Sequence, residues 1–197
     1  MRYLTLILVV IIFSCKSETK TEIKTEVETG VGAKADMEIE NEIDTSVSKM
    51  WSDFLEANPE FKNDGLPEAD SFHNNEADAK RLADLIVSGK KQAGSMLYFF
   101  FEEAKADLPA IGTKSIVTNF DGKARAIIEI TKVDTIPFNQ VSAAYAELDM
   151  GTNIEPLEKW KKAHWDFFAS SMEEKGVQPT EEMLVVCEWF ETVWPEK

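Results

Sequence analysis

The middle of the chain carries hydrophobic residues at three- and four-residue spacing, a pattern typical of amphipathic helices. The first such segment predicts a helix that begins near Thr45, with Thr45 or Ser46 as its N-cap. Pro59 ends this helix, because the residue before a proline disfavours the helical region. A second helix is expected over Glu76–Ser88, with Gly89 at its C-terminal exit.

Later segments alternate short apolar runs with turn residues and longer periodic segments. Asp121-Gly122, between two apolar runs, predicts a tight hairpin. The expected elements are a strand over Ser95–Phe101, a loop over Leu108–Gly112, strands over Ser115–Phe120 and Ala124–Val133, helices over Phe138–Leu148 and Pro156–Lys175, and a strand over Glu182–Val193. This order predicts an α+β domain over residues 45–197, a compact β-barrel or antiparallel sheet with flanking helices rather than a parallel α/β fold.

The N-terminus has the layout of a secretory signal peptide over residues 1–14. Arg2 supplies a positive charge, and the apolar run from Tyr3 to Phe13 is too short to span a bilayer, which needs roughly 20 residues. Ser14-Cys15 resembles the end of the lipobox of bacterial lipoproteins. That resemblance implies that Cys15 becomes the acylated N-terminus, so that a lipid anchor holds the protein on a membrane of the bacterial envelope, facing outside the cytoplasm. The alternatives are an ordinary cleaved signal and an uncleaved anchor.

Residues 15–44 separate this signal from the predicted domain. They consist largely of Glu, Lys, Thr and short aliphatic residues, with no aromatic side chain and little material for a core. Such a composition predicts a disordered linker between the membrane and the domain.

The overall charge restricts the partners of the domain. The formal net charge is −15, which repels polyanions at long range and argues against binding to long DNA or RNA. The charge still allows a local basic site for a small ligand.

The cysteines and histidines restrict the chemistry. If Cys15 is acylated, Cys187 has no disulfide partner, and its apolar surroundings favour a buried small residue over a reactive nucleophile. With only two histidines and no Cys/His ligand spacing, we expect no metal site, and no cofactor is predicted. His164 lies on one helix face with Trp160 and Phe168, which favours a histidine packed among aromatic rings over a ligand or a base.

The segment Gly89-Lys90-Lys91-Gln92-Ala93-Gly94-Ser95 invites comparison with a phosphate-binding loop. It does not match, because the lysines stand between the glycines and the preceding element is a helix. The two lysines still lie at a helix C-terminus, where the helix dipole favours positive charge.

Several short motifs follow one another along the chain. They are Phe72-His73-Asn74, Ala83–Lys91, Leu108–Gly112, Ala126–Val133 with Pro137–Val141, Trp160–Phe168 and Val185–Phe190. In this order they together resemble the ASCH domain, a compact fold related to the PUA fold of RNA-binding proteins. The resemblance covers about Ser48 to Trp194 and implies a role linked with RNA metabolism. Some members of the family resemble ribonucleases or amidohydrolases that act on acylated cytidine.

In those amidohydrolases a Lys, a Thr three residues later and a Glu in a later helix are proposed to act together. The Lys corresponds to Lys91, the Thr position holds Gly94, and the Glu position falls near Asp149. Ser95 offers a hydroxyl only from the opposite face of a strand. A hydroxyl nucleophile needs a base within hydrogen-bond reach, and a Lys serves as a base only if its pKa is lowered.

Three hypotheses follow. In the first, a membrane-anchored ASCH-like domain binds a nucleotide- or nucleoside-like molecule or a short RNA through Lys90, Lys91, Ser95 and Asp149. In the second, it is a hydrolase that uses Lys91 and Asp149 as catalytic residues, with Ser95 or Glu129. In the third, it is a non-enzymatic interaction module of the envelope with a degenerate site.

Overall fold

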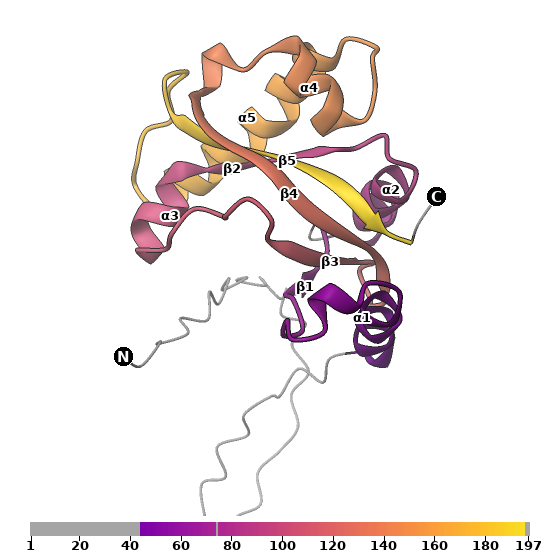
Figure 1. Cartoon of the computed structure of the whole chain (residues 1–197). Helices are drawn as coiled ribbons and strands as arrows, with labels where there is room; N and C mark the ends of the chain where they lie inside the picture. Colours follow the sequence, from indigo (N-terminus) through magenta and orange to yellow (C-terminus); the bar gives the residue numbers. More distant parts are fainter. Residues whose placement is uncertain (1–43, 74, 196–197) are drawn as a thin grey trace, which may run out of the picture. The chain divides into compact units, whose positions relative to one another are not determined.

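The computed structural model describes residues 44–73 and 75–195 (Figure 1). The predicted signal peptide, Cys15 and all but the last residue of the predicted linker lie outside these residues, so the lipid anchor stays a prediction. Within the described ranges, no helix has the length and apolar character needed to cross a membrane.

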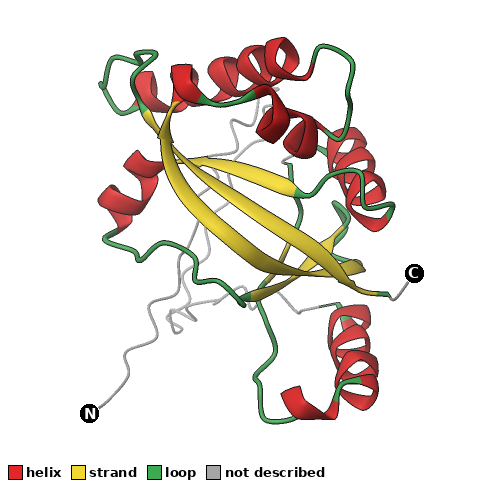
Figure 2. Ribbon diagram, turned by 45° about the horizontal axis from the view of Figure 1, so that its top comes forward, coloured by secondary structure: helices red, strands yellow, loops and turns green. Residues whose placement is uncertain are grey.

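The described residues form one five-stranded sheet with five α-helices around it (Figures 1 and 2). The order of the strands in the sheet is β1-β3-β4-β5-β2, and all pairings are antiparallel except that of β1 with β3. The strands are β1 (Ala69–Asp70), β2 (Ala93–Leu97), β3 (Lys114–Thr118), β4 (Ala124–Pro137) and β5 (Leu184–Trp194). The α+β class is therefore confirmed, with a mixed sheet. Closure of the sheet into a barrel stays a prediction, since β1 and β2 are the two edges of the described sheet.

The hairpin between β3 and β4 confirms the Asp121-Gly122 signal. Gly122 has a φ of +78°, a left-handed conformation that glycine adopts without steric cost. The side chain of Asn119 completes the turn by accepting hydrogen bonds from the backbone N–H groups of Asp121 and Lys123, at 3.1 and 2.9 Å.

The four predicted helices form, and α3 is a helix that the sequence did not predict. The helices are α1 (Thr45–Ala57), α2 (Glu76–Val87), α3 (Tyr98–Ala104), α4 (Ala143–Met150) and α5 (Pro156–Glu174). The predicted N-cap of α1 is wrong by one residue, because the side chain of Asp44 accepts from the backbone N–H of Ser46 at 2.8 Å. For α2, Asn75 caps the helix by accepting from Asp78 N–H at 2.9 Å.

The prediction of a strand over Ser95–Phe101 is wrong in its second half. β2 ends at Leu97, where its register on β5 reaches Val185, and β5 itself begins only one residue earlier, at Leu184. The residues that follow have no strand to pair with. Because their backbone groups still need hydrogen bonds, Tyr98–Ala104 forms a helix instead.

The predicted helix over Phe138–Leu148 is two elements. Phe138–Gln140 is a 3₁₀ turn, and α4 starts only after Ser142, whose hydroxyl accepts from the backbone N–H of Tyr145 at 3.2 Å. The cap moves the helix start by several residues but leaves the end of α4 close to where the sequence predicts it.

Three groups of buried side chains stabilise the fold. The largest lies between the sheet and α4 and α5, which sit together at one end of the sheet in Figures 1 and 2. A second lies between the sheet and α2, and includes Phe190 and Ile130. The third packs α1 onto β3 and β4 through Val47, Trp51 and Phe54.

We expect Phe54→Ala to lower the free energy of unfolding by about 3–5 kcal/mol, measured by chemical denaturation of the full chain. The ring is 2% exposed and stacks on Trp51 with centroids 5.1 Å apart, so its removal leaves a cavity under α1. Phe120→Ala is the control: that ring is 51% exposed at the hairpin, and its removal is expected to change stability by less than about 0.5 kcal/mol. Equal losses in the two variants would show that α1 is not part of the core.

Candidate functional site

Lys91 follows the end of α2 and is fixed by the way that helix ends. Gly89 has a φ of +68°, as expected for a glycine at a helix exit, and its N–H bonds to the carbonyl of Ile86 at 2.8 Å. The N–H groups of Lys90 and Lys91 both bond to the carbonyl of Leu85, at 2.9 and 3.1 Å. The backbone therefore turns sharply, and the Lys91 side chain enters the interior, where the residue is 4% exposed.

Asp149 lies in the last turn of α4 and is 2% exposed. Gly151 ends the helix with a φ of +64°, and a Cβ at this position would lie 3.3 Å from Leu85 and 3.4 Å from the carbonyl carbon of Lys90. The glycine thus allows the end of α4 to approach the turn after α2. A hydrogen bond of 2.9 Å from Gln92 N–H to the Leu148 carbonyl joins the two segments.

These two segments bring Lys91 and Asp149 together across 58 residues of sequence. The Lys91 Nζ donates to Asp149 Oδ1, and also to the backbone carbonyl of Asp149 at 2.7 Å. It lies 5.5 Å from the centroid of the Phe72 ring, close enough for a cation–π contact.

The second carboxylate oxygen of Asp149 collects donors from β2 and α5. Ser95 Oγ donates to Oδ2 at 2.6 Å and Trp160 Nε1 at 2.8 Å, while His164 Nε2 lies 3.4 Å away. Ser95 also contacts the Tyr145 hydroxyl at 3.0 Å, and that hydroxyl donates to the Gly94 carbonyl. Among the described residues, every buried side-chain polar atom has a hydrogen-bond partner. These contacts form one connected polar network with Asp149 at its centre.

The network keeps Asp149 ionised. Burial raises the pKa of Asp149, but the charges of Lys91 and His164 and the hydrogen bonds from Lys91 and Ser95 lower it by more, so that its pKa falls below the usual value. Burial lowers the pKa of His164, against the opposing effect of Asp149. Lys91 is the partner that forms the ion pair with this carboxylate.

His164 joins the network as well as the aromatic packing that the sequence predicts. Its ring stacks on Trp160 with centroids 4.4 Å apart and meets Phe168 at 5.4 Å, and Nδ1 lies 3.0 Å from the Trp160 carbonyl. The position of Nε2 beside Asp149 was not predicted. Cys187 is fully buried, as expected, and burial raises the pKa of its thiol to about 12. The described residues contain no cluster of side chains suited to hold a metal ion.

Gly94 and Ser95 lie on opposite faces of β2. A Cβ at Gly94 would meet the rings of Phe72 at 3.6 Å and Phe190 at 3.9 Å, whereas the Ser95 hydroxyl points to Asp149 on the other face. The hydroxyl that the resemblance places at residue 94 is thus missing. Ser95 reaches the carboxylate from the other side of the strand.

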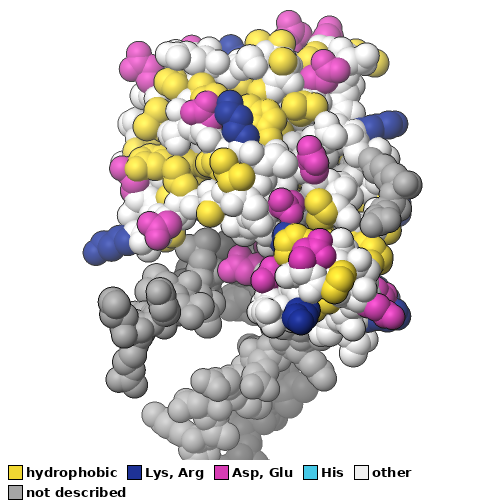
Figure 3. All heavy atoms as spheres, viewed as in Figure 1, with side chains coloured by type: hydrophobic (Ala, Val, Ile, Leu, Met, Phe, Trp, Pro, Cys, Tyr) yellow, Lys and Arg dark blue, Asp and Glu magenta, His cyan; other side chains and the backbone are white. Residues whose placement is uncertain are grey.

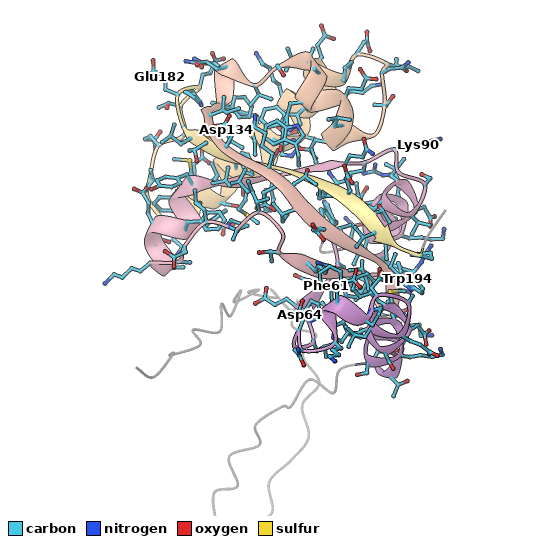
Figure 4. All side chains as sticks on the ribbon, in the orientation of Figure 1. Phe61, Asp64, Lys90, Asp134, Glu182 and Trp194 are labelled. Carbon is cyan, nitrogen blue, oxygen red and sulfur yellow. The ribbon has the colours of Figure 1, made fainter. Side chains whose placement is uncertain are left out.

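Lys90 does not join this network. Its residue is exposed, and Figure 4 shows the side chain pointing away beside the end of α2. It lines a shallow surface hollow of about 390 Å³ with Lys80, Arg81 and Asp84. A smaller hollow of about 110 Å³ lies between α2 and the β3–β4 turn. Lys91 and Asp149 line neither hollow. Glu129 on β4 pairs with Lys114 on β3 at 2.8 Å, and β5 separates these two strands from β2 in the sheet.

Glu188 is a candidate that the sequence reasoning missed. It lies in β5, beside Gly94 in the strand register, and is only partly exposed. Burial first, and then the negative charge of Asp149, raise its pKa to about 7. The signal available in the sequence was a lone carboxylate inside the apolar run from Met183 to Phe190.

Residues 68–194 match the family model of the ASCH domain. The chain belongs to the ASCH domain family. α1 lies before the matched range.

Two solved structures resemble this ASCH protein over most of their length. The crystal structure of an ASCH domain from Lactobacillus crispatus JV V101 is 31% identical, with a TM-score of 0.70, over 78% of this chain and 97% of that chain. A protein from Enterococcus faecalis V583 is 29% identical, with a TM-score of 0.67, over 75% of this chain and 88% of that chain. None of the curated proteins compared with the chain matches it.

We expect Lys91→Met alone and Asp149→Asn alone each to lower the free energy of unfolding by about 3–5 kcal/mol, because each leaves the partner's charge buried and unpaired. The double variant Lys91→Met/Asp149→Asn is expected to lose much less than the sum, since it leaves no buried charge. Denaturant titrations of the four proteins measure this cycle.

The control for this cycle is the exposed pair Lys162–Asp166 on α5, whose charged atoms are 3.1 Å apart. Asp166→Asn is expected to change stability by less than about 1 kcal/mol. If the losses in the Lys91 and Asp149 variants simply add, the buried pair does not have the energetic role assigned to it.

Glu188→Gln is expected to stabilise the protein at pH 8 and to have little effect at pH 4. Between the unfolded pKa of about 4.5 and the folded pKa of about 7, the parent carboxyl is ionised only in the unfolded chain, so its stability falls as the pH rises through this window. The expected gain at pH 8 relative to pH 4 is roughly 2 kcal/mol, from denaturation curves at several pH values. Glu191→Gln, at an exposed carboxylate of the same strand, is the control. A gain that does not grow with pH would contradict the assignment.

Proposed function

We propose that this ASCH protein is a binding domain for a nucleotide- or nucleoside-like small molecule or a short RNA, rather than a hydrolase. The observation that carries the proposal is the ionised pair of Lys91 and Asp149 beside a glycine at residue 94. A lysine has three N–H donors. In the described part of the chain Asp149 accepts from two of them, which leaves the third for a ligand on the side of Phe72.

The same pair argues against hydrolysis by Lys91. A general base must be able to accept a proton from a nucleophile, whereas the Lys91 Nζ already donates to Asp149 in an ion pair. At residue 94 there is no hydroxyl to activate, and the hydroxyl of the next residue, Ser95, faces the other side of the strand. The arrangement therefore suits recognition of a ligand better than transfer of an acyl or phosphoryl group.

One observation favours the hydrolase as a second candidate. The Ser95 hydroxyl donates at 2.6 Å to an ionised carboxylate, which is the contact that a base makes with a nucleophile. The hydroxyl is also held by Tyr145 and Trp160, so its oxygen is surrounded by partners that fix it in place. Turnover of an acylated nucleoside that is lost in Ser95→Ala would favour this second candidate.

The charge distribution supports a small ligand over a long nucleic acid. The chain carries 36 acidic and 21 basic residues. On the face drawn in Figure 3, Lys and Arg side chains are scattered singly among Asp and Glu and form no continuous basic track. A long polyanion needs many phosphate contacts, so the binding partner is proposed to be short.

The lipid anchor at Cys15 is part of this proposal. It would place the binding domain on a membrane of the bacterial envelope, outside the cytoplasm, at the end of the linker over residues 15–44. An ASCH domain in this place serves capture or sensing of a ligand better than processing of cytoplasmic RNA. The third candidate, an envelope module with a degenerate site, predicts no ligand at all.

Calorimetry of the full chain against a panel of nucleosides, nucleotides and short RNAs tests the proposal. We expect at least one compound to bind, and the double variant Lys91→Met/Asp149→Asn to weaken it by at least about tenfold, because one charge-assisted hydrogen bond contributes roughly 1.5 kcal/mol or more. This double variant is chosen because it removes both charges and leaves no unpaired charge in the core. Lys162→Ala, which breaks an exposed pair, is expected to bind like the parent chain.

Two results would overturn the proposal. Absence of binding across the whole panel would favour the degenerate module. Binding that is unchanged in a folded Lys91→Met/Asp149→Asn variant would place the ligand elsewhere on the domain.

A further inference from the structure

Glu188 is a partly exposed carboxylate in the otherwise apolar first half of β5. In the register it stands between Gly94 on β2 and Val133 on β4. Residues directly opposite one another on neighbouring strands share a face of the sheet. The Glu188 side chain therefore extends on the face where Gly94 would carry a Cβ, the face of Phe72 and Phe190, and not on the face of Ser95.

This carboxyl group has no partner of its own. None of the described residues forms an ion pair with Glu188 or donates a side-chain hydrogen bond to it, and the groups that act on its charge are its burial and the repulsion of Asp149. Glu188 is only partly exposed, and partial removal of a carboxylate from water costs free energy. A hydrogen-bond donor supplied by a ligand would lower this cost.

Solvent reaches this face next to Glu188. Met96 lies two residues after Gly94 on the same face and is 41% exposed. On β4, Thr135 lies two residues after Val133, the partner of Glu188, and is partly exposed. Gly94 presents no side chain toward Glu188. At the other border, the Phe72 ring lies against Gly94 and beside the Lys91 ammonium. A ligand entering past Met96 would thus meet a carboxyl group, an aromatic ring and one N–H of Lys91.

We propose that Glu188 is the specificity-determining acceptor of the binding site, and that it takes a planar ligand edge with two N–H donors side by side, as on a guanine-type ring. The two oxygens of a carboxylate match two adjacent donors in a bidentate arrangement. The Phe72 ring offers an apolar surface to a planar group. This inference rests on the proposed binding function and adds the chemical edge that the site selects.

Guanosine and inosine are the probes, because they differ only in the exocyclic amino group that completes the pair of donors. We expect the full chain to bind guanosine about tenfold more tightly than inosine in calorimetry, as one bidentate contact allows. In Glu188→Gln the preference is expected to fall to about threefold or less, since the amide offers one acceptor in place of two. Glu191→Gln, the exposed carboxylate three residues along β5, is expected to keep the full preference.

The same variant gives a readout that a purely structural role would not change. Two donors on the carboxylate lower its pKa, so guanosine binding is expected to release a proton and to tighten about threefold from pH 6.5 to pH 8. The other titratable groups to be considered are those of the adjacent network: Asp149 from α4, Lys91 from the turn after α2, and His164 from α5. The pKa values of Asp149 and His164 are both lowered, which moves their titration below this range. Glu188→Gln is expected to remove the proton release.

The outcomes separate this inference from the proposed function. If other compounds of the panel bind but guanosine has no advantage over inosine, or if the advantage survives in Glu188→Gln, the role of Glu188 is overturned and the binding function stands. If nothing binds, both are overturned. A thermal melt of Glu188→Gln beside the parent chain shows that both compared proteins are folded.

Discussion

The ion pair between Lys91 and Asp149 joins four parts of the fold at one point. Lys91 comes from the turn after α2, Asp149 from the end of α4, Ser95 from the edge strand β2, and Trp160 from α5. Taking two charges out of water costs several kcal/mol each, so the pair is tolerable only because Ser95 and Trp160 also donate to the carboxylate and the Asp149 carbonyl accepts from Lys91. The positions of β2, α4 and α5 therefore depend on one another through this carboxylate.

The edge strand β2 separates two kinds of chemistry on its two faces. On one face Ser95 belongs to the network of Asp149, where each polar atom already has a partner. On the other face Gly94 lies opposite Glu188, whose carboxyl group has no described partner. A satisfied network holds a structure in place, whereas a partly buried carboxyl group without a partner can gain free energy from a ligand that donates to it. For this ASCH protein, the second face is the better candidate for recognition.

Local signals predicted most of the helices and the hairpin correctly. Asp121-Gly122 specified its turn, because few residues other than glycine adopt the positive φ that the turn needs. The run Tyr98–Phe101 was wrongly predicted as a strand, since aromatic residues favour strands. The antiparallel partner β5 begins at Leu184, next to the residue that pairs with Leu97, so no partner remains for Tyr98 and the residues after it. Strand length is decided by the neighbouring strand, and periodicity within one segment cannot report where that neighbour begins.

The sequence by itself determined the α+β class, most of the helices, the β3–β4 hairpin, the family, and the candidacy of Lys91 and Asp149 through their motifs. Only the tertiary structure decided that these two residues neutralise each other, that Ser95 serves Asp149 while Lys90 does not, and that Glu188 is isolated. The physical reason is the distance along the chain. Propensity and turn chemistry act over a few residues, whereas burial and pKa depend on strand register and helix packing, which bring together groups 58 residues apart.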